Sequence, residues 1–262
     1  MLELEIVSPS HIEQAAQIFH RDGFVAIENA LTDEQFGIIK EAAHRVVVEQ
    51  TQAIALEKAN RGYARYSFGS QTHHLEWAML IDLPTILPIV EKIFDSNQFV
   101  SSGGGGDYSL PGAKIQHLHA DMPDHIKDPQ QRVTIMDLPT PFIVVNFPMI
   151  DFSKENGATR FIKGTHRSRH PIPKLDEEPE WMKNAIACAP AQSAIIRDVR
   201  CWHGGTPNTS QDTRIMTSTG YYAPWFRRPG MAGDMPRAIY NTLSERAKEL
   251  CRFIVSLEEP TQ

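Results

Sequence analysis

From residue 97 onward the chain consists of short apolar or alternating runs that are separated by Gly, Pro, Asn and Asp. Alternation with a period of two places successive side chains on opposite faces of a strand, and the turn residues end each strand after a few positions. Many short strands at this spacing are typical of an antiparallel sandwich or jelly roll. The runs are QFVSS, AKIQHLHAD, PFIVVNFPMID, TRFIKG, QSAIIRD and RIMTSTGYYAPW.

The residues before this region have helical spacing instead. Ser10 with Glu13, and Thr32 with Gln35, are spaced as capping boxes, in which two side chains satisfy free N–H groups at a helix N-terminus. The first helix is expected to end near Gly23, and FVAIENAL is expected to form a short strand after it. TILPIVEKIFDS predicts a further helix.

Helical spacing returns in LSERAKELCRFIVSL near the end of the chain, so helices flank the β core on both sides. The sequence therefore predicts an α+β chain built on a barrel. Its 262 residues fit one domain, residues 1–262. We expect a mainly helical flank over residues 1–96, the β core over 97–228 and a helical segment over 229–262. A polar segment at 122–140 interrupts the core and fits either a lid or a surface loop.

Composition argues against several classes of partner. A net charge of −6 and an isoelectric point near 6 do not suit binding to nucleic acid or to an anionic membrane. MLELEIVSPS lacks the basic flank and apolar run of a signal peptide, and no stretch is apolar enough to span a bilayer. Three scattered cysteines fit a reducing compartment. We expect a cytoplasmic protein with a small-molecule substrate, and the sequence leaves its oligomeric state open.

QHLHAD at 116–121 places two histidines and an aspartate close together. On a strand, His117, His119 and Asp121 would share a face, at intervals of roughly 6–7 Å. One interpretation is the zinc motif of metallo-β-lactamases, although that motif needs a histidine directly after the aspartate, where this chain has Met122. The other interpretation takes His119 and Asp121 as two ligands of a facial two-histidine-one-carboxylate triad, which leaves three metal positions open and suits Fe(II).

A third ligand is expected in RCWHGGTPNTSQDTRIMTSTGYY. The turn-rich residues between His203 and Arg214 predict a hairpin centred between Asn208 and Thr209, which would set the histidine and the arginine opposite each other on one face. One pocket would then hold a metal-binding imidazole and a guanidinium, which stays charged and suits a carboxylate.

Together these pieces resemble the phytanoyl-CoA dioxygenase-like branch of the Fe(II)/2-oxoglutarate oxygenases. The matching stretches follow the order of that family: HRDGFVAIENAL, HAD at 119–121, ENGATRFIKGTHR at 155–167 and HGGTPNTSQDTR at 203–214. The resemblance implies a double-stranded β-helix, which is a jelly-roll, cupin-like barrel. It also implies iron held by His119, Asp121 and His203 as the catalytic centre.

The same resemblance implies 2-oxoglutarate as cosubstrate, with its far carboxylate bound to Arg214 and with Gln116 and Thr159 as further contacts. The implied reaction uses O2 to oxidise a C–H bond, by hydroxylation, desaturation or ring closure, and releases succinate and CO2. Related halogenases lack the carboxylate ligand, so the presence of Asp121 argues against halogenation. We expect a role in biosynthetic tailoring or in small-molecule catabolism.

Substrate contacts are expected in GYARYSFGSQTHH and YYAPWFRR. The candidate pocket residues are Tyr63, Arg65, His73, His117, Trp225 and Phe226. The four glycines at 103–106 lack the helix and Lys-Ser/Thr of a phosphate loop, and instead predict a bulge or a close backbone approach to the pocket.

Two other classes of protein remain open at this point. A zinc hydrolase would use His117, His119, Asp121 and His203, but it leaves Arg214 without a role. A non-catalytic, cupin-like binding protein on the same barrel is the second, and the intact set of ligands argues against it.

Overall fold

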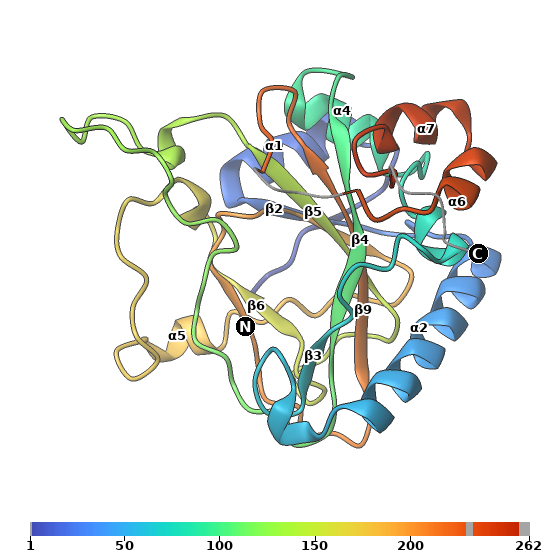
Figure 1. Cartoon of the computed structure of the whole chain (residues 1–262). Coiled ribbons are helices and arrows are strands. Elements are labelled where there is room, and N and C mark those ends of the chain that lie inside the picture. Colours follow the sequence, from blue (N-terminus) through green and yellow to red (C-terminus); the bar gives the residue numbers. More distant parts are fainter. Residues whose placement is uncertain (1, 229–232, 257–262) are drawn as a thin grey trace.

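A seven-stranded sheet forms the larger wall of the molecule (Figure 1). The structure is a computed structural model that describes residues 2–228 and 233–256. All neighbours in this sheet run antiparallel except the parallel pair β1–β2. In spatial order its strands are β1 (Ile6–Val7), β2 (Phe24–Ile27), β7 (Ala194–Asp198), β5 (Phe142–Pro148), β9 (Arg214–Tyr222), β4 (Val100–Ser109) and β3 (Arg65–Ser67).

A second, much smaller sheet pairs β6 (Thr159–Phe161) with β8 (His203–Gly205). An isolated β-bridge joins His119, which lies outside the named strands, to His203 of β8. Two sheets with flanking helices confirm the predicted α+β class.

Helices α1, α4 and α7 gather on one side of the larger sheet, at the top of Figure 1. An apolar cluster fills the space between, with Phe19 of α1 and Ile89 of α4 packed in one core with Val145 and Ile196 of the sheet. The helices are α1 (Ile12–Asp22), α2 (Asp33–Ala53), α3 (Leu75–Ala78), α4 (Leu87–Phe94), α5 (Glu180–Lys183), α6 (Arg237–Thr242) and α7 (Glu245–Cys251), with 3₁₀ turns η1 (Leu56–Lys58), η2 (Ile135–Asp137) and η3 (Thr165–Arg167). None of the helices in the described ranges has the length and hydropathy to cross a membrane.

The helix ends test the capping predictions. The Thr32–Gln35 capping box is confirmed, with both reciprocal hydrogen bonds present. The Ser10 box is wrong, because α1 begins one residue later than that box requires, with His11 at the N-cap and no side-chain cap bond. Gly23 ends α1 in the left-handed conformation, with φ of 87°, as predicted. Of the predicted C-terminal segment, residues 229–232 and 257–262 lie outside the described residues.

The four glycines lie inside β4, and the predicted bulge is confirmed by a register shift between Ser101 and Gly103. Gly106 has φ of +133°, and a Cβ atom there would lie 2.1 Å from the carbonyl oxygen of Met216 on β9. Glycine is therefore required where β4 and β9 approach each other along the cavity described below.

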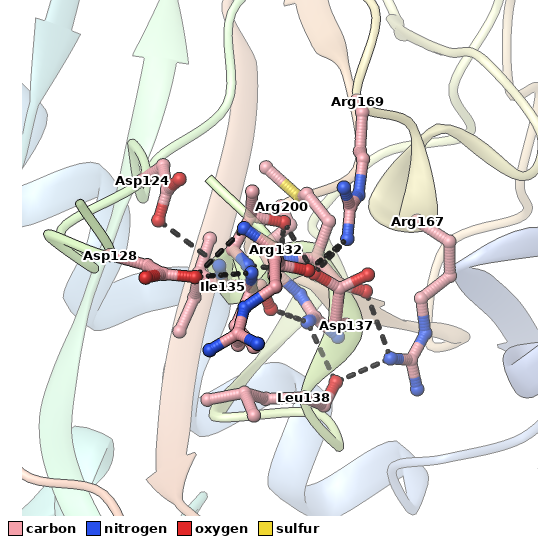
Figure 2. A network of polar contacts seen from close by, with 12 residues as sticks. Asp124, Asp128, Arg132, Ile135, Asp137, Leu138, Arg167, Arg169 and Arg200 are labelled. Carbon is pink, nitrogen blue, oxygen red and sulfur yellow. Dashed lines mark hydrogen bonds and ion pairs between the residues drawn. The ribbon is translucent and has the colours of Figure 1, made fainter. Parts of the chain in front are cut away.

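Three arginines hold the polar segment 122–140 against the body of the protein (Figure 2). Buried Arg200 donates to the carbonyl oxygens of Ile135 and Leu138, at 2.6 and 3.0 Å. Arg169 pairs with Asp137, and Arg167 donates to the Leu138 carbonyl as well. The segment is thus a fastened loop beside the barrel.

Candidate active site

His119 and His203 face each other across an edge of the smaller sheet. The backbone N–H of each donates to the carbonyl oxygen of the other at 2.9 Å, and the ring centroids lie 4.4 Å apart. This pairing brings together two ligands that are far apart in sequence.

The backbone also fixes which ring nitrogen of each histidine is free. Nδ1 of His203 lies 2.9 Å from the carbonyl oxygen of Cys201, and Nδ1 of His119 lies 3.2 Å from that of His117. A carbonyl oxygen only accepts, so each proton sits on Nδ1 and each Nε2 keeps its lone pair for a metal. Burial lowers the pKa of His203 to about 3 and lowers that of His119 as well, so both rings are neutral at pH 7.

Asp121 completes the group with one carboxylate oxygen directed at the two imidazoles. Its Oδ1 lies 3.6 Å from Nε2 of His203 and 4.0 Å from Nε2 of His119. One donor atom from each of the three residues lies within 4.8 Å of the other two. Two imidazole nitrogens and one carboxylate oxygen are the donor set of a facial triad for Fe(II).

Arg197 of β7 holds the other oxygen of Asp121. Its Nη2 donates to Oδ2 at 2.7 Å, and its Nε donates to Oδ1 of Asn146 at 3.0 Å. Burial opposes ionisation of Asp121, but Arg197 and then His203 outweigh it, and the pKa of the carboxyl is lowered. The carboxylate therefore stays ionised and offers a single oxygen to a metal. Arg197 was missed in the sequence, although a charge inside the apolar run AIIRDV was the available signal.

The segment that carries His119 and Asp121 is not the regular strand that was predicted. Only His119 takes part in a bridge. Single backbone hydrogen bonds run from the N–H of Gln116 to the Gly205 carbonyl and from that of Asp121 to the Val199 carbonyl, and buried side chains hold the rest.

A fully buried ion pair joins Arg160 of β6 to Glu178. Glu178 accepts from the N–H of Leu118 at 3.2 Å, and Arg160 donates to the carbonyl of Gln116 at 2.7 Å. These two residues, also missed in the sequence, supplement the few backbone hydrogen bonds of the ligand segment.

A cavity of about 360 Å³ opens beside the three ligands, and Arg214 of β9 lines it. The Arg214 side chain lies over the ring of Phe152, at 5.4 Å, and its Nη1 makes a hydrogen bond to the sulfur of Met216 at 3.9 Å. Within the described ranges its buried Nε has no hydrogen-bond partner, and no carboxylate pairs with it. A buried guanidinium without an oxygen partner fits an anionic ligand such as the far carboxylate of 2-oxoglutarate.

The predicted hairpin between His203 and Arg214 is wrong. Arg214 pairs with Ser109 in the larger sheet, and His203 pairs with Phe161 in the smaller one. The turn-rich residues between them cross from one sheet to the other instead of reversing within one. The histidine and the arginine still line the same cavity, because they face it from opposite walls.

Gln116 and Thr159 both line the cavity. The amide of Gln116 is already engaged at both ends: its Oε1 accepts from the N–H of Gly205 at 2.9 Å, and its Nε2 donates to the carbonyl of Arg61 at 3.0 Å. The hydroxyl of Thr159 faces the cavity wall without a hydrogen bond to any described residue.

Of the six residues predicted to contact the substrate, the structure places Arg65 in the cavity wall. It is buried, and its guanidinium donates to the carbonyls of Lys114 and Thr206. The other five lie outside the cavity lining. Phe226 packs beside an apolar cluster, and four side chains are exposed: Tyr63, His73, His117 and Trp225.

Comparison with known proteins agrees with this geometry. The profile of the family described as phytanoyl-CoA dioxygenase (PhyH) matches residues 19–216, which is more than half of the chain. The dioxygenase olcK of Penicillium canescens is 26% identical, over 94% of this chain and 82% of its own length. The Fe(II)/2-oxoglutarate-dependent dioxygenase nvfF of Aspergillus novofumigatus is 24% identical, over 89% of this chain and 79% of its own.

Solved structures share the fold at low sequence identity. The non-haem α-ketoglutarate-dependent epimerase SnoN from nogalamycin biosynthesis has a TM-score of 0.63 and 16% identity, covering 87% of this chain and 89% of its own. HygX from Streptomyces hygroscopicus, solved with nickel, 2-oxoglutarate and hygromycin B, has a TM-score of 0.61 and 16% identity, covering 81% and 88%. The predicted jelly-roll core is thereby confirmed.

The barrel and its two-histidine-one-carboxylate centre define a mononuclear non-haem iron oxygenase. The chain belongs to the phytanoyl-CoA dioxygenase family and is an Fe(II)- and 2-oxoglutarate-dependent dioxygenase, with His119, Asp121 and His203 as its facial triad. This assignment decides against the zinc hydrolase and the non-catalytic binding protein. His117, which the hydrolase needed, is exposed and lies outside the ligand cluster.

Proposed function

We propose that this dioxygenase oxidises a C–H bond of a small organic molecule in biosynthetic tailoring. The outcome is hydroxylation, desaturation or ring closure, with release of succinate and CO2. The observation that carries the proposal is the meeting, in one cavity, of the triad and the Arg214 guanidinium that has no oxygen partner among the described residues.

When bound, Fe(II) and 2-oxoglutarate supply the activation of O2 that is coupled to oxidative decarboxylation. The chain contributes position and charge. His119, Asp121 and His203 would hold the metal, and three protein ligands would leave coordination positions for the cosubstrate and O2. Arg214 binds the far carboxylate of the cosubstrate, and Thr159 donates its free hydroxyl to it.

Gln116 acts mainly as a brace between Gly205 and the Arg61 carbonyl, since both ends of its amide are engaged. One lone pair of its Oε1 and one proton of its Nε2 are not used by these two bonds and are available to contact the cosubstrate.

Tailoring is supported by the solved structures that share the fold. SnoN is described as an epimerase from nogalamycin biosynthesis, and HygX was solved with hygromycin B bound. The alternative role is small-molecule catabolism, which would use the same site. We further propose that residues 1–262 act as one domain, with the flanks 1–96 and 229–262 around a core at 97–228, and that the protein works in the cytoplasm.

The proposal is tested by adding Fe(II) and then 2-oxoglutarate to metal-free protein without oxygen, and by recording the visible charge-transfer band of the chelate. The band is expected in the wild type and should be lost in His203→Ala. Arg214→Ala should bind iron normally but need about 100-fold more 2-oxoglutarate, because a buried charge-assisted bond is lost. Tight zinc binding without a 2-oxoglutarate band would overturn the proposal.

A further inference from the structure

The cavity has a positive charge, although the chain as a whole has a net charge of −6. Five guanidinium groups and two carboxylates line it, which gives a net charge of +3 because the two histidines are neutral. These groups are Arg61, Arg65, Arg197, Arg214 and Arg228 against Asp107 and Asp121. The charges of Fe(II) and 2-oxoglutarate cancel, so the proposed cofactors leave this excess unchanged.

Shifts in the pKa values of the lining residues do not remove this excess of positive charge. Burial, and then repulsion from Arg214, lowers the pKa of Arg65 to about 9, and burial lowers that of Arg214 to about 10, so both stay charged at neutral pH. Burial raises the pKa of Asp107, which can only reduce the negative charge in the cavity. Arg65, Arg197 and Arg214 are buried, whereas Arg61 and Arg228 are exposed. This concentration of positive charge favours an anionic ligand and disfavours a cationic one.

Strand register orders these groups along the cavity. Arg214 begins β9. Asn146 pairs with Ser218 of β9, four residues beyond Arg214. Arg197 donates hydrogen bonds both to Asn146 and to the metal ligand Asp121, so this point of the strand lies near the metal centre. Val144 pairs with β9 six residues beyond Arg214, a separation of roughly 20 Å along the strand. The metal centre therefore lies between the Arg214 end, which takes the cosubstrate, and a far end that the cosubstrate leaves free.

The far end combines apolar side chains with one cation. Phe142 and Val144 line it and pack in the same apolar cluster as Met122 and Ile135 of the fastened loop. The guanidinium of Arg228 lies over the ring of Phe142, at 5.3 Å.

Arg228 is anchored at this end but keeps free donors. Its Nη2 donates to the carbonyl oxygen of Asp121 at 3.0 Å, so it lies beside the metal centre. Within residues 2–228 and 233–256 no carboxylate pairs with it, so its other N–H groups remain free for a ligand. A guanidinium fork that is fixed by a ring and a carbonyl is suited to bidentate binding of a carboxylate.

We propose that the substrate is an organic acid with an apolar body, whose carboxylate is bound by Arg228 while Phe142 and Val144 contact its hydrocarbon part. This inference rests on the proposed function, because it needs the cosubstrate at the Arg214 end. Held in this way, the acid would lie beside the three metal ligands, with its hydrocarbon part as the group to be oxidised.

The test uses protein loaded with Fe(II) and 2-oxoglutarate in the absence of oxygen. Three acids with apolar bodies, cyclohexanecarboxylate, hydrocinnamate and decanoate, are titrated alongside their primary amides. Binding is followed by the shift of the charge-transfer band, and succinate release is then measured in air. At least one acid should bind about 10-fold or more tightly than its amide, as expected for a charge-assisted bond, and should raise succinate release.

Variants assign the selectivity to one side chain. Arg228→Gln should reduce the affinity for the acid about 10-fold or more without changing that for the amide, and Arg228→Lys should restore part of it. Arg227→Gln is the matched control, because Arg227 is the next residue, bonds to the carbonyls of Ala223 and Phe226, and lies outside the cavity lining.

The outcomes separate the two proposals. If the band does not form with 2-oxoglutarate alone, the proposed function fails. If the band forms but the amides bind as well as the acids, or no acid binds at all, only the substrate inference fails. Equal losses in Arg228→Gln and Arg227→Gln would also overturn it.

Discussion

The two walls of the cavity are built in different ways. The wall that carries Arg214 is the seven-stranded sheet, in which β9 pairs with β4 from Arg214 onward and with β5 from Met216 onward. The opposite wall carries all three metal ligands, yet among the described residues its only paired strands are the short β6 and β8, supplemented by isolated bridges such as His119–His203 and Arg160–Ile186. Continuous ladders of backbone hydrogen bonds position the first wall, whereas scattered backbone hydrogen bonds and a few buried side chains position the second. A substitution that disrupts the second wall should therefore weaken iron binding, whereas one that disrupts the first wall should weaken 2-oxoglutarate binding.

The largest effect is expected from Glu178→Gln. The substitution leaves the fully buried guanidinium of Arg160 without a counter-ion, which costs about 3–5 kcal/mol of folding free energy. Because the pair also holds the backbone beside His119, iron affinity should fall in the protein that remains folded. Chemical denaturation and iron titration measure the two effects.

Glu180→Gln is the control for this change, since Glu180 belongs to an exposed pair with Lys183 on nearby α5. It should alter neither quantity measurably. A stable Glu178→Gln protein with normal iron affinity would show that the smaller wall does not depend on the ion pair.

The next effect is on the regular wall, through Gly106→Ala. The added Cβ meets the Met216 carbonyl oxygen, and the positive φ is strained for alanine, so we expect a loss of about 1–3 kcal/mol. Because β4 and β9 carry the Arg214 side of the cavity, 2-oxoglutarate should bind more weakly while iron binds as in the wild type. Calorimetry and the charge-transfer titration measure these quantities.

Gly112→Ala separates backbone strain from the clash. Gly112 also has a positive φ, of +84°, but nothing lies within 4 Å of the added Cβ. It should lose stability through strain alone and keep normal 2-oxoglutarate affinity. Equal effects of both variants on the cosubstrate would contradict the distinction between the walls.

Arg197 connects the two walls, because it leaves β7 of the larger sheet and ends on the metal ligand Asp121. Arg197→Gln should weaken iron binding about 10- to 100-fold, as expected when a group that orients a metal ligand is lost. Arg197→Lys keeps the charge without the fork and should recover only part of the affinity. An unchanged iron affinity with a lowered melting temperature would assign Arg197 a role in folding alone.

The contrast between the walls also explains what could be predicted from sequence. Short apolar or alternating runs between turn residues identified β5, β7 and β9, because residues of a regular strand carry their own pattern. It failed for the segment of His119 and Asp121, whose shape depends on Glu178, a residue in a loop with no periodic signal. The ligands were identified by their residue types and spacing, so the triad was predicted correctly even though the strand and the hairpin used to place it were wrong.

The residues at the proposed substrate end of the cavity were predicted least well, because they too lie in a segment without a periodic pattern. Trp225 and Phe226 were chosen from an aromatic-rich stretch, but Arg228, two residues further on, is the side chain that lines the cavity. Which residues of an irregular segment point inward depends on contacts such as that between Arg228 and the Asp121 carbonyl, which sequence spacing does not encode.

The smallest effect is expected outside both walls, at Arg169, which pairs with Asp137 of the fastened loop (Figure 2). Its hydrogen bond lowers the pKa of Asp137 to about 2, so the contact is fully present above the ordinary pKa of 3.8 and is lost only as the pH falls toward 2. Arg169→Ala should leave the melting temperature and iron affinity unchanged at neutral pH, because the pair is exposed. Hydrogen exchange at residues 134–138 should rise only modestly, since buried Arg200 still holds the carbonyls of Ile135 and Leu138. A large increase in exchange would mean that the exposed arginine, and not the buried one, fastens the loop.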